Sequence, residues 1–211
     1  MTPLDYDFLR QALKQQSGLA LGAEKHYFVE SRLLPLARQG GHRGVGELVL
    51  ALKTTCDAAL MTAVVEAMTT SESFFFRDKM PFDHFRRLVM PALLAARRQS
   101  RAVRIWCAAA ANGQELYSIA ICLQEMASAI ADWRIEILAT DLSRPVLSRA
   151  RQGLYSQFEV QRGLKLLVKY FTQVGEQWQI APQVRAMVKY RHFNLLADFA
   201  SLGTFDVIPG R

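Results

Sequence analysis

Residues 69–77 place four hydroxyl side chains and one carboxylate directly before three phenylalanines and an arginine. Neither the helical nor the strand period of apolar residues explains such blocks. Ser71 and Ser73 can cap a helix that begins near Phe74, and the free N–H groups of a helix N-terminus suit a carboxylate or another polar ligand. The guanidinium of Arg77 has a planar fork that matches a carboxylate. The segment predicts a ligand-binding element, with a capped helix carrying buried aromatic residues as the alternative.

A second group of polar residues follows a short apolar run. Residues 103–106 read as a strand, residues 107–111 as a turn of small side chains, and residues 116–123 as a helix preceded by Gly113 and Glu115. Small side chains at such a turn let a ligand lie against the backbone, where the helix N-terminus supplies donors. The three glycines of a dinucleotide-binding turn are absent, so a pyrophosphate is not the favoured ligand.

An acid ends the next strand-like run, residues 133–141. At the end of the second strand of a βαβ unit, Asp141 would hold the two hydroxyls of a ribose. Alternatively, Asp141 caps a helix that begins near Ser143 with Pro145 in its first turn, and both roles are compatible. A nucleoside site without a pyrophosphate grip indicates an adenosyl sulfonium cofactor.

The order of these motifs resembles that of the CheR-type chemotaxis receptor methyltransferases, which move a methyl group from S-adenosylmethionine to receptor glutamates. The matching segments are residues 69–77, 105–108, 113–118, 139–143, 150–155, 162–163, 170–171, 193–196 and 205–208. The resemblance implies an α/β fold: a Rossmann-like S-adenosylmethionine-dependent methyltransferase domain, preceded by a small all-helical domain and carrying a small antiparallel β insert.

The resemblance also implies which residues bind the cofactor, whose product is S-adenosylhomocysteine. They are Ser71, Ser73, Arg77, Glu115, Asp141, Asn194 and Leu195. Glu115 resembles the partner of the cofactor's amino group and Asp141 the ribose partner. Asn194 and the backbone of Leu195 resemble the adenine clamp. Arg77 is expected in addition to place the substrate carboxylate, as the catalytic residue.

Each of these roles has a structural alternative. Glu115 also suits the N-terminus of its helix, Arg77 can pair with Asp78 or Glu72, and Asn194 can simply end a strand.

The chain departs from the family pattern in three places. Ser71 and Ser73 replace an asparagine and a threonine, and Leu116 replaces a proline. Family members continue after the strand at residues 205–208 with Phe-Cys-Arg-Asn, whereas this chain ends in Pro-Gly-Arg. We therefore expect a C-terminally truncated methyltransferase domain. A catalytically impaired, S-adenosylmethionine-binding regulator is the alternative function, and a nicotinamide-dependent enzyme is disfavoured by the single-glycine turn.

The elements that must position these residues fall into two domains. Residues 1–68 predict a helical domain, with helices over 5–16, 24–38, 46–52 and 57–68. In the resembled family this domain covers the cofactor site and touches the receptor through a basic helix. Lys25, Arg32 and Arg38 fall in the matching helix, which Pro35 is expected to interrupt.

Residues 69–211 predict the methyltransferase domain, with an insert at about residues 161–187. The insert reads as a helix over 161–170, a hairpin of residues 170–173 and 177–180, and a further turn or helix. Its short hairpin turn predicts no tether to a pentapeptide at the receptor tail.

Composition limits the remaining classes of function. Of the 211 residues 51% are hydrophobic, which argues against disorder, and three separated cysteines fit a reducing cytoplasm. Four scattered histidines predict no metal, and short apolar runs predict no membrane insertion. The net charge is +7, with its densest arginine group in residues 86–104, yet no nucleic-acid motif accompanies it. We expect a monomer whose partner is a methyl-accepting chemotaxis receptor or a similar signalling protein.

Overall fold

The computed structural model describes residues 1–69, 73–161 and 169–209. The chain divides into two compact units. The first contains Met1–Thr70 and Asn194–Asp198, and the second contains Ser71–Phe193 and Phe199–Arg211. Each unit has its own apolar core, and the two are described separately.

The first unit is helical, as the sequence predicts. Its helices are α1 (Pro3–Ser17), α2 (His26–Gln39), α3 (Val45–Thr55) and α4 (Ala58–Met68). Thr2 and Asp5 form a capping box at the start of α1, and Gly18 ends this helix with a left-handed φ of 76°. The expected interruption at Pro35 is wrong, because α2 continues through this residue.

Apolar residues at helical spacing form the core of this unit. Leu9 and Leu13 of α1 are fully buried, as are Val29 and Leu33 of α2. Residues four positions apart lie on one face of a helix, so each pair supplies an inward stripe.

A parallel sheet forms the centre of the second unit. Its strands are β1 (Ala102–Cys107), β2 (Arg134–Asp141) and β6 (Val188–His192), in the order β1-β2-β6. On the other edge of β1, Ile105 forms a parallel bridge with Val207. The register pairs Cys107 with Ala139 and Asp141 with His192, so the carboxyl ends of the three strands lie at the same edge.

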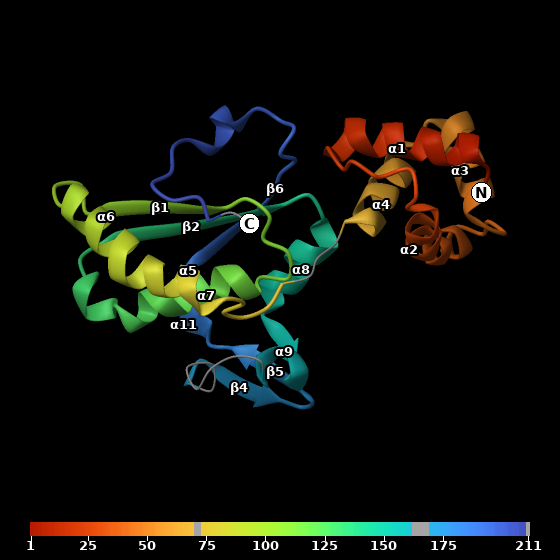
Figure 1. The fold of residues 1–211 in the computed structure, drawn as a ribbon. Coiled ribbons are helices and arrows are strands. Elements are labelled where there is room, and N and C mark those ends of the chain that lie inside the picture. Colours follow the sequence, from red (N-terminus) through yellow and green to blue (C-terminus); the bar gives the residue numbers. More distant parts are fainter. Residues whose placement is uncertain (70–72, 162–168, 210–211) are drawn as a thin grey trace. The chain divides into compact units, whose positions relative to one another are not determined.

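The two faces of this sheet bury different clusters. Ile105 and Ile137 point into the larger core, which α7 (Gln114–Glu125) covers. Trp106 and Leu138, one residue further along each strand, point to the opposite face and pack with Phe193. Successive side chains of a strand alternate between faces, so adjacent residues serve separate cores. Figure 1 shows α5 (Lys79–His84), α6 (Met90–Ala96) and α7 on one side of β1 and β2.

Short elements complete the second unit. A small antiparallel sheet has the order β3-β5-β4, and its hairpin turn contains Gly175 at φ 62°. The predicted hairpin is therefore present, whereas most of the helix expected over 161–170 lies outside the described residues. The bounds are α5 (Lys79–His84), η1 (Phe85–Val89), α6 (Met90–Ala96), η2 (Ala127–Ala129), α8 (Arg144–Gln152), β3 (Leu154–Ser156), α9 (Gln157–Gln161), β4 (Phe171–Val174), β5 (Gln177–Ile180), α11 (Pro182–Arg185) and η3 (Phe199–Leu202).

The helix expected to begin near Phe74 is the clearest correction. The chain forms a turn instead, and α5 begins only at Lys79. Phe75 is buried, with its ring edge-on to the rings of Tyr155 and Phe171 at centroid distances of 4.9 and 5.2 Å. Anchoring this ring in the insert draws the backbone away from a helical path, and Phe76 adopts a left-handed φ of 47°.

Candidate functional site

The loop between β1 and α7 depends on a glycine. Gly113 has a φ of 91°, and a Cβ there would lie 3.0 Å from the Tyr155 hydroxyl oxygen and 3.1 Å from the Ala150 Cβ. The same hydroxyl donates to the carbonyl oxygen of Asn112 at 2.8 Å. The absence of a side chain therefore lets the start of α7 pack tightly against α8 and β3.

Asp141 is held at the carboxyl end of β2 by backbone donors from two sides. Its Oδ2 accepts from the Ala111 N–H and its Oδ1 from the Ser143 N–H, each at 2.9 Å. The hydroxyl of Ser143 caps α8, so the alternative that Asp141 is the cap residue is wrong. Carboxylate oxygens accept more than one hydrogen bond, and the half-buried Asp141 side chain keeps acceptor capacity for a ligand.

Hydrogen bonds to Thr140 stabilise the carboxyl ends of β1 and β2. The Trp106 indole N–H donates to the Thr140 hydroxyl oxygen at 2.9 Å, and the Thr140 hydroxyl donates to the Ala108 carbonyl at 3.2 Å. Ala110 N–H donates to the Thr140 carbonyl at 2.9 Å. Thr140 thus links the loop after β1 to the end of β2. The sequence alone does not predict this role of Thr140.

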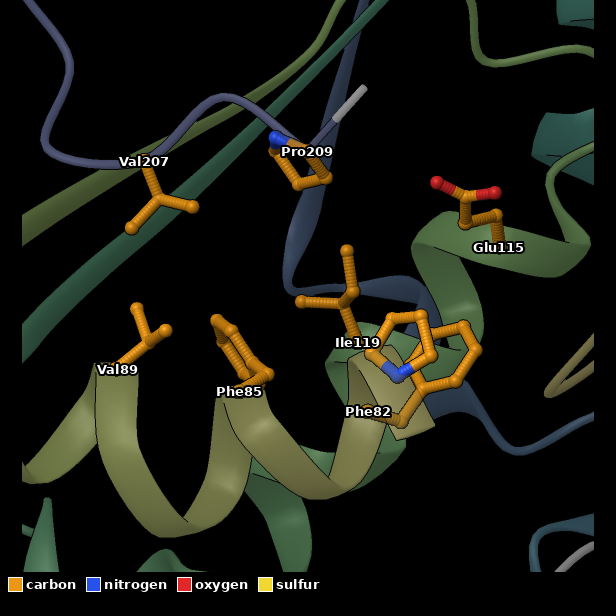
Figure 2. A pocket seen from close by; sticks show the side chains of 8 residues that line it. Phe82, Phe85, Val89, Glu115, Ile119, Val207 and Pro209 are labelled. Atoms are coloured by element: carbon orange, nitrogen blue, oxygen red, sulfur yellow. The ribbon is translucent and has the colours of Figure 1, made fainter. Parts of the chain in front are cut away.

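Glu115 lies in the first turn of α7 and lines an apolar pocket of about 200 Å³. The other lining residues are Pro81, Phe82, Phe85, Val89, Ile119, Val207 and Pro209. In Figure 2 the Glu115 carboxylate lies on the side of the pocket where Pro209 lies, and the rings of Phe82 and Phe85 close the other side. A single carboxylate at an apolar wall suits a ligand that combines a cationic and an apolar part.

Cys107, at the end of β1, is an unreactive thiol at neutral pH. Burial raises the pKa of its thiol to about 12, and the negative charge of Glu115 acts in the same direction. The thiolate is the reactive form of cysteine, so Cys107 is a packing residue at neutral pH.

The segment with Ser73 and Arg77 runs beside the start of α7. Ser73 donates from its hydroxyl to Oε1 of Gln114, the residue before Glu115. Phe76 N–H donates to the Ser118 hydroxyl oxygen at 2.9 Å. The Arg77 guanidinium lies 5.9 Å from the centre of the Phe74 ring. Ser71 lies outside the described residues.

Asn194 and Leu195 group with the helical unit. The Asn194 side-chain amide donates to the Gln16 carbonyl at 2.7 Å, and its Oδ1 accepts from the Leu196 N–H at 3.0 Å. The side chain of Asn194 therefore stabilises a turn against the end of α1. Because these two residues and Asp141 fall in different units, the adenine clamp stays a prediction.

Residues 1–69, 73–161 and 169–209 hold no group of three or more His, Cys, Asp or Glu side chains that could bind a metal ion. In those same ranges no helix has the length and apolar character that crossing a bilayer requires.

The edge of the sheet fits an adenosyl sulfonium compound better than a dinucleotide. Gly113 lets the start of α7 pack against α8 and β3, Asp141 offers acceptors for a diol, and Glu115 offers a counter-charge for an amino group. Sequence reasoning identified these three residues but missed Gln114 and Glu159, which are hydrogen-bonded to each other. The Ser-x-x-Glu spacing of residues 156–159, a capping-box pattern, is the signal that could have pointed to Glu159.

Comparisons with known proteins agree with this assignment. A family model described as "CheR methyltransferase, SAM binding domain" matches residues 71–211, and one described as "CheR methyltransferase, all-alpha domain" matches residues 4–69. The chain is 38% identical to "Chemotaxis protein methyltransferase 1" of Pseudomonas aeruginosa over 97% of its own length and 76% of the relative's. It is 37% identical to "Chemotaxis protein methyltransferase Cher2" of Pseudomonas putida, with the same coverage. For "Chemotaxis protein methyltransferase 1" of Vibrio cholerae the identity is 33%, over 96% of this chain and 74% of that protein. The chain belongs to the CheR methyltransferase family, with an all-helical domain followed by an S-adenosylmethionine-binding domain.

Proposed function

We propose that this protein is an S-adenosylmethionine-dependent O-methyltransferase that forms glutamyl methyl esters on a chemotaxis receptor. The observation that carries the proposal is the pair of family matches, which together span nearly the whole chain. The placement of Glu115 and Asp141 around the loop after β1 supports the same cofactor. The relatives named above are chemotaxis protein methyltransferases, which supports a role in chemotactic adaptation.

The residues of the sheet edge would hold the cofactor, which supplies a methyl group on a positively charged sulfur. Asp141 would accept from the ribose hydroxyls and Glu115 would pair with the amino group. Ser71 and Ser73 would supply hydroxyl contacts, and Asn194 with Leu195 would hold the adenine. This assignment involves no metal ion.

The chain's task toward the substrate is placement. A glutamate carboxylate is already ionised at neutral pH, so a strong general base is unnecessary. Holding the carboxylate in line and removing water from it would supply the rate enhancement. Arg77 would orient the carboxylate through its planar fork.

We propose further that the helical unit contacts the receptor. Lys25, Arg32 and Arg38 are exposed on or beside α2 and offer positive charge to an acidic partner. The turn between β4 and β5 is short, as expected of an enzyme without a tether to a receptor-tail pentapeptide. A monomer in the cytoplasm, without nucleic-acid contacts, fits this role.

Calorimetric titration with S-adenosylhomocysteine tests the cofactor assignment. The intact chain should bind, and Glu115→Ala should weaken binding about tenfold or more, because charged hydrogen bonds contribute about 1.5–3 kcal/mol. Asp132→Ala is the matched control, since this exposed acid pairs with Arg101 at 3.4 Å on the surface. Equal binding by both variants would contradict the role of Glu115, and competition by NAD would favour a nicotinamide enzyme.

A methyl-transfer assay with isotopically labelled cofactor tests the reaction. Methyl esters release methanol in base, whereas methylated nitrogen does not, so base-labile label on the receptor fragment would support glutamate O-methylation. Binding of S-adenosylhomocysteine without transfer to a receptor substrate would favour the alternative of a catalytically impaired regulator.

A further inference from the structure

Gln114 is a buried polar residue, with an exposed fraction of 1%, that cofactor binding does not explain. Its side-chain oxygen accepts from the Ser73 hydroxyl, and its Nε2 donates to Glu159 Oε1 at 3.0 Å. An ionised carboxylate only accepts hydrogen bonds, so the amide nitrogen must face Glu159 and the oxygen must face Ser73. The acceptor and the donor of the Gln114 side-chain amide therefore bind two segments that are distant in the sequence.

Glu159 is itself held from several sides. Arg149 Nη2 lies 3.0 and 3.2 Å from its two carboxylate oxygens. The Ser156 backbone N–H and hydroxyl each donate to Glu159 Oε2 at 2.9 Å. Because α8 and the end of β3 both hold this carboxylate, it offers Gln114 a fixed acceptor.

The segment that contains Ser73 and Arg77, which contacts the side-chain oxygen of Gln114, has a strained backbone. Phe76 and Asp78 have φ values of 47° and 82°, so Arg77 lies between two residues in conformations that side chains rarely adopt. Such conformations persist only where surrounding contacts impose them. Besides the packing of the Phe75 ring, these contacts include the bond from Ser73 to Gln114 and the bond from Phe76 N–H to Ser118. The Ser118 hydroxyl in turn donates to the Gln114 carbonyl at 2.7 Å.

We propose that Gln114 is a positioning residue for the Ser73–Arg77 segment, oriented by Glu159 and Arg149. It links α8 and α9, which carry Arg149 and Glu159, to the backbone that carries Arg77. The importance of Arg77 to the reaction rests on the proposed function, but the hydrogen-bond relay stands on the contacts alone.

Hydrogen exchange of the 73–77 backbone amides in the intact chain tests the relay without methyl transfer. Gln114→Leu removes the side-chain hydrogen bonds to Ser73 and Glu159 at similar size and keeps the backbone carbonyl that Ser118 contacts. The loss of the Ser73 contact should speed exchange of the Phe76 amide about tenfold, because its bond to Ser118 would open locally more often. Gln124→Leu is the matched control on the same helix, since its amide contacts Met187 and not the segment. Unchanged exchange in Gln114→Leu, or an equal change in Gln124→Leu, would overturn the proposal.

Exchanging the side chains of residues 114 and 159 distinguishes a positioning role of Gln114 from a general contribution to stability. Gln114→Glu sets two carboxylates against each other and should loosen the segment, whereas the double variant Gln114→Glu with Glu159→Gln restores an amide–carboxylate pair. The double variant should recover protection of the Phe76 amide relative to Gln114→Glu. Failure of this rescue in a folded double variant would contradict the relay.

Kinetics then connect the relay to the reaction. Gln114→Leu should lower kcat about tenfold while the Kd for S-adenosylhomocysteine changes less than about threefold. If the wild-type chain transfers no methyl group, the proposed function fails while the exchange results still decide the relay. If the wild type is active and kcat is unchanged in Gln114→Leu, the positioning role is wrong.

Discussion

The proposed role of Arg77 at the substrate carboxylate can be tested with lysine. Lysine keeps the charge but presents a point donor where arginine presents a fork. For Arg77→Lys we expect kcat/KM toward the receptor to fall about tenfold or more, the usual effect of losing one charged hydrogen bond. Arg87→Lys, at an exposed arginine of η1, is the matched control and should behave as wild type. Equal kinetics of wild type and Arg77→Lys would remove Arg77 from the substrate site.

Gly113 gives a stability prediction of its own. Gly113→Ala must adopt a φ of 91° and place its Cβ within 3.0 Å of the Tyr155 oxygen. Strain and overpacking together should lower the free energy of unfolding by about 2–4 kcal/mol. In Gly175→Ala, at φ 62° with nothing within 4 Å, only the strain applies. Urea unfolding that shows equal losses for both variants would contradict the steric role of Gly113.

Among single residues, the sequence supports predictions for those whose own side-chain chemistry suits a ligand. Glu115 and Asp141 stand at the start of a helix and the end of a strand, where local rules assign them a ligand role. Gln114 and Thr140 act through partners far along the chain, Glu159 and Trp106, and no local pattern identifies such pairs.

At the scale of elements, strands and helices with clear periodicity are predictable. The expected strand over 133–141 is β2, and the expected helix over 57–68 is α4 with Asp57 as its cap. The start of α5 was not predictable, because burial of the Phe75 ring against the insert, a tertiary effect, outweighs the capping preference of the serines. Continuation of α2 through Pro35 likewise overrides a local rule.

The start of α1 predicts a specific pH dependence. Hydrogen bonds from Lys53 and Thr2 lower the pKa of Asp5 to about 2. A carboxyl whose pKa is lowered by folding stabilises the folded state above its unfolded pKa of about 4, and this contribution is lost as the pH falls toward 2. Asp5→Asn should therefore be less stable than wild type at pH 5, with a difference that shrinks between pH 4 and pH 2.

Urea midpoints across this range provide the measurement. Asp7→Asn on the same helix removes a charge without touching the capping box and is the control. A difference between wild type and Asp5→Asn that stays constant from pH 5 to pH 2 would contradict the assignment.

For the whole molecule, the two units should unfold separately. Each has its own core, and the three tryptophans, Trp106, Trp133 and Trp178, all belong to the second unit. Tryptophan fluorescence therefore reports the second unit, whereas far-ultraviolet circular dichroism reports both. We expect the two urea curves to differ, with S-adenosylhomocysteine moving the fluorescence curve to higher urea. Superimposable curves in the absence of ligand would indicate a single cooperative unit.

Acidic side chains partly neutralise the arginine group of residues 86–104. Arg97 pairs with Asp206 at 2.7 Å, Arg101 with Asp132 at 3.4 Å, and Arg104 with Glu136 at 3.2 Å. Such pairing leaves less positive charge at this arginine group to attract a polyanion than the arginines alone suggest.

The strained turn around Arg77 has a consequence for directed evolution. Asp78 is exposed and has a φ of 82°, a conformation that glycine adopts without steric strain. Selection for heat resistance should therefore enrich Asp78→Gly, and a library sorted afterwards for methyl transfer should lose it again, because a relaxed turn holds Arg77 less firmly. Such opposing selection at one codon would identify a position where durability and turnover compete.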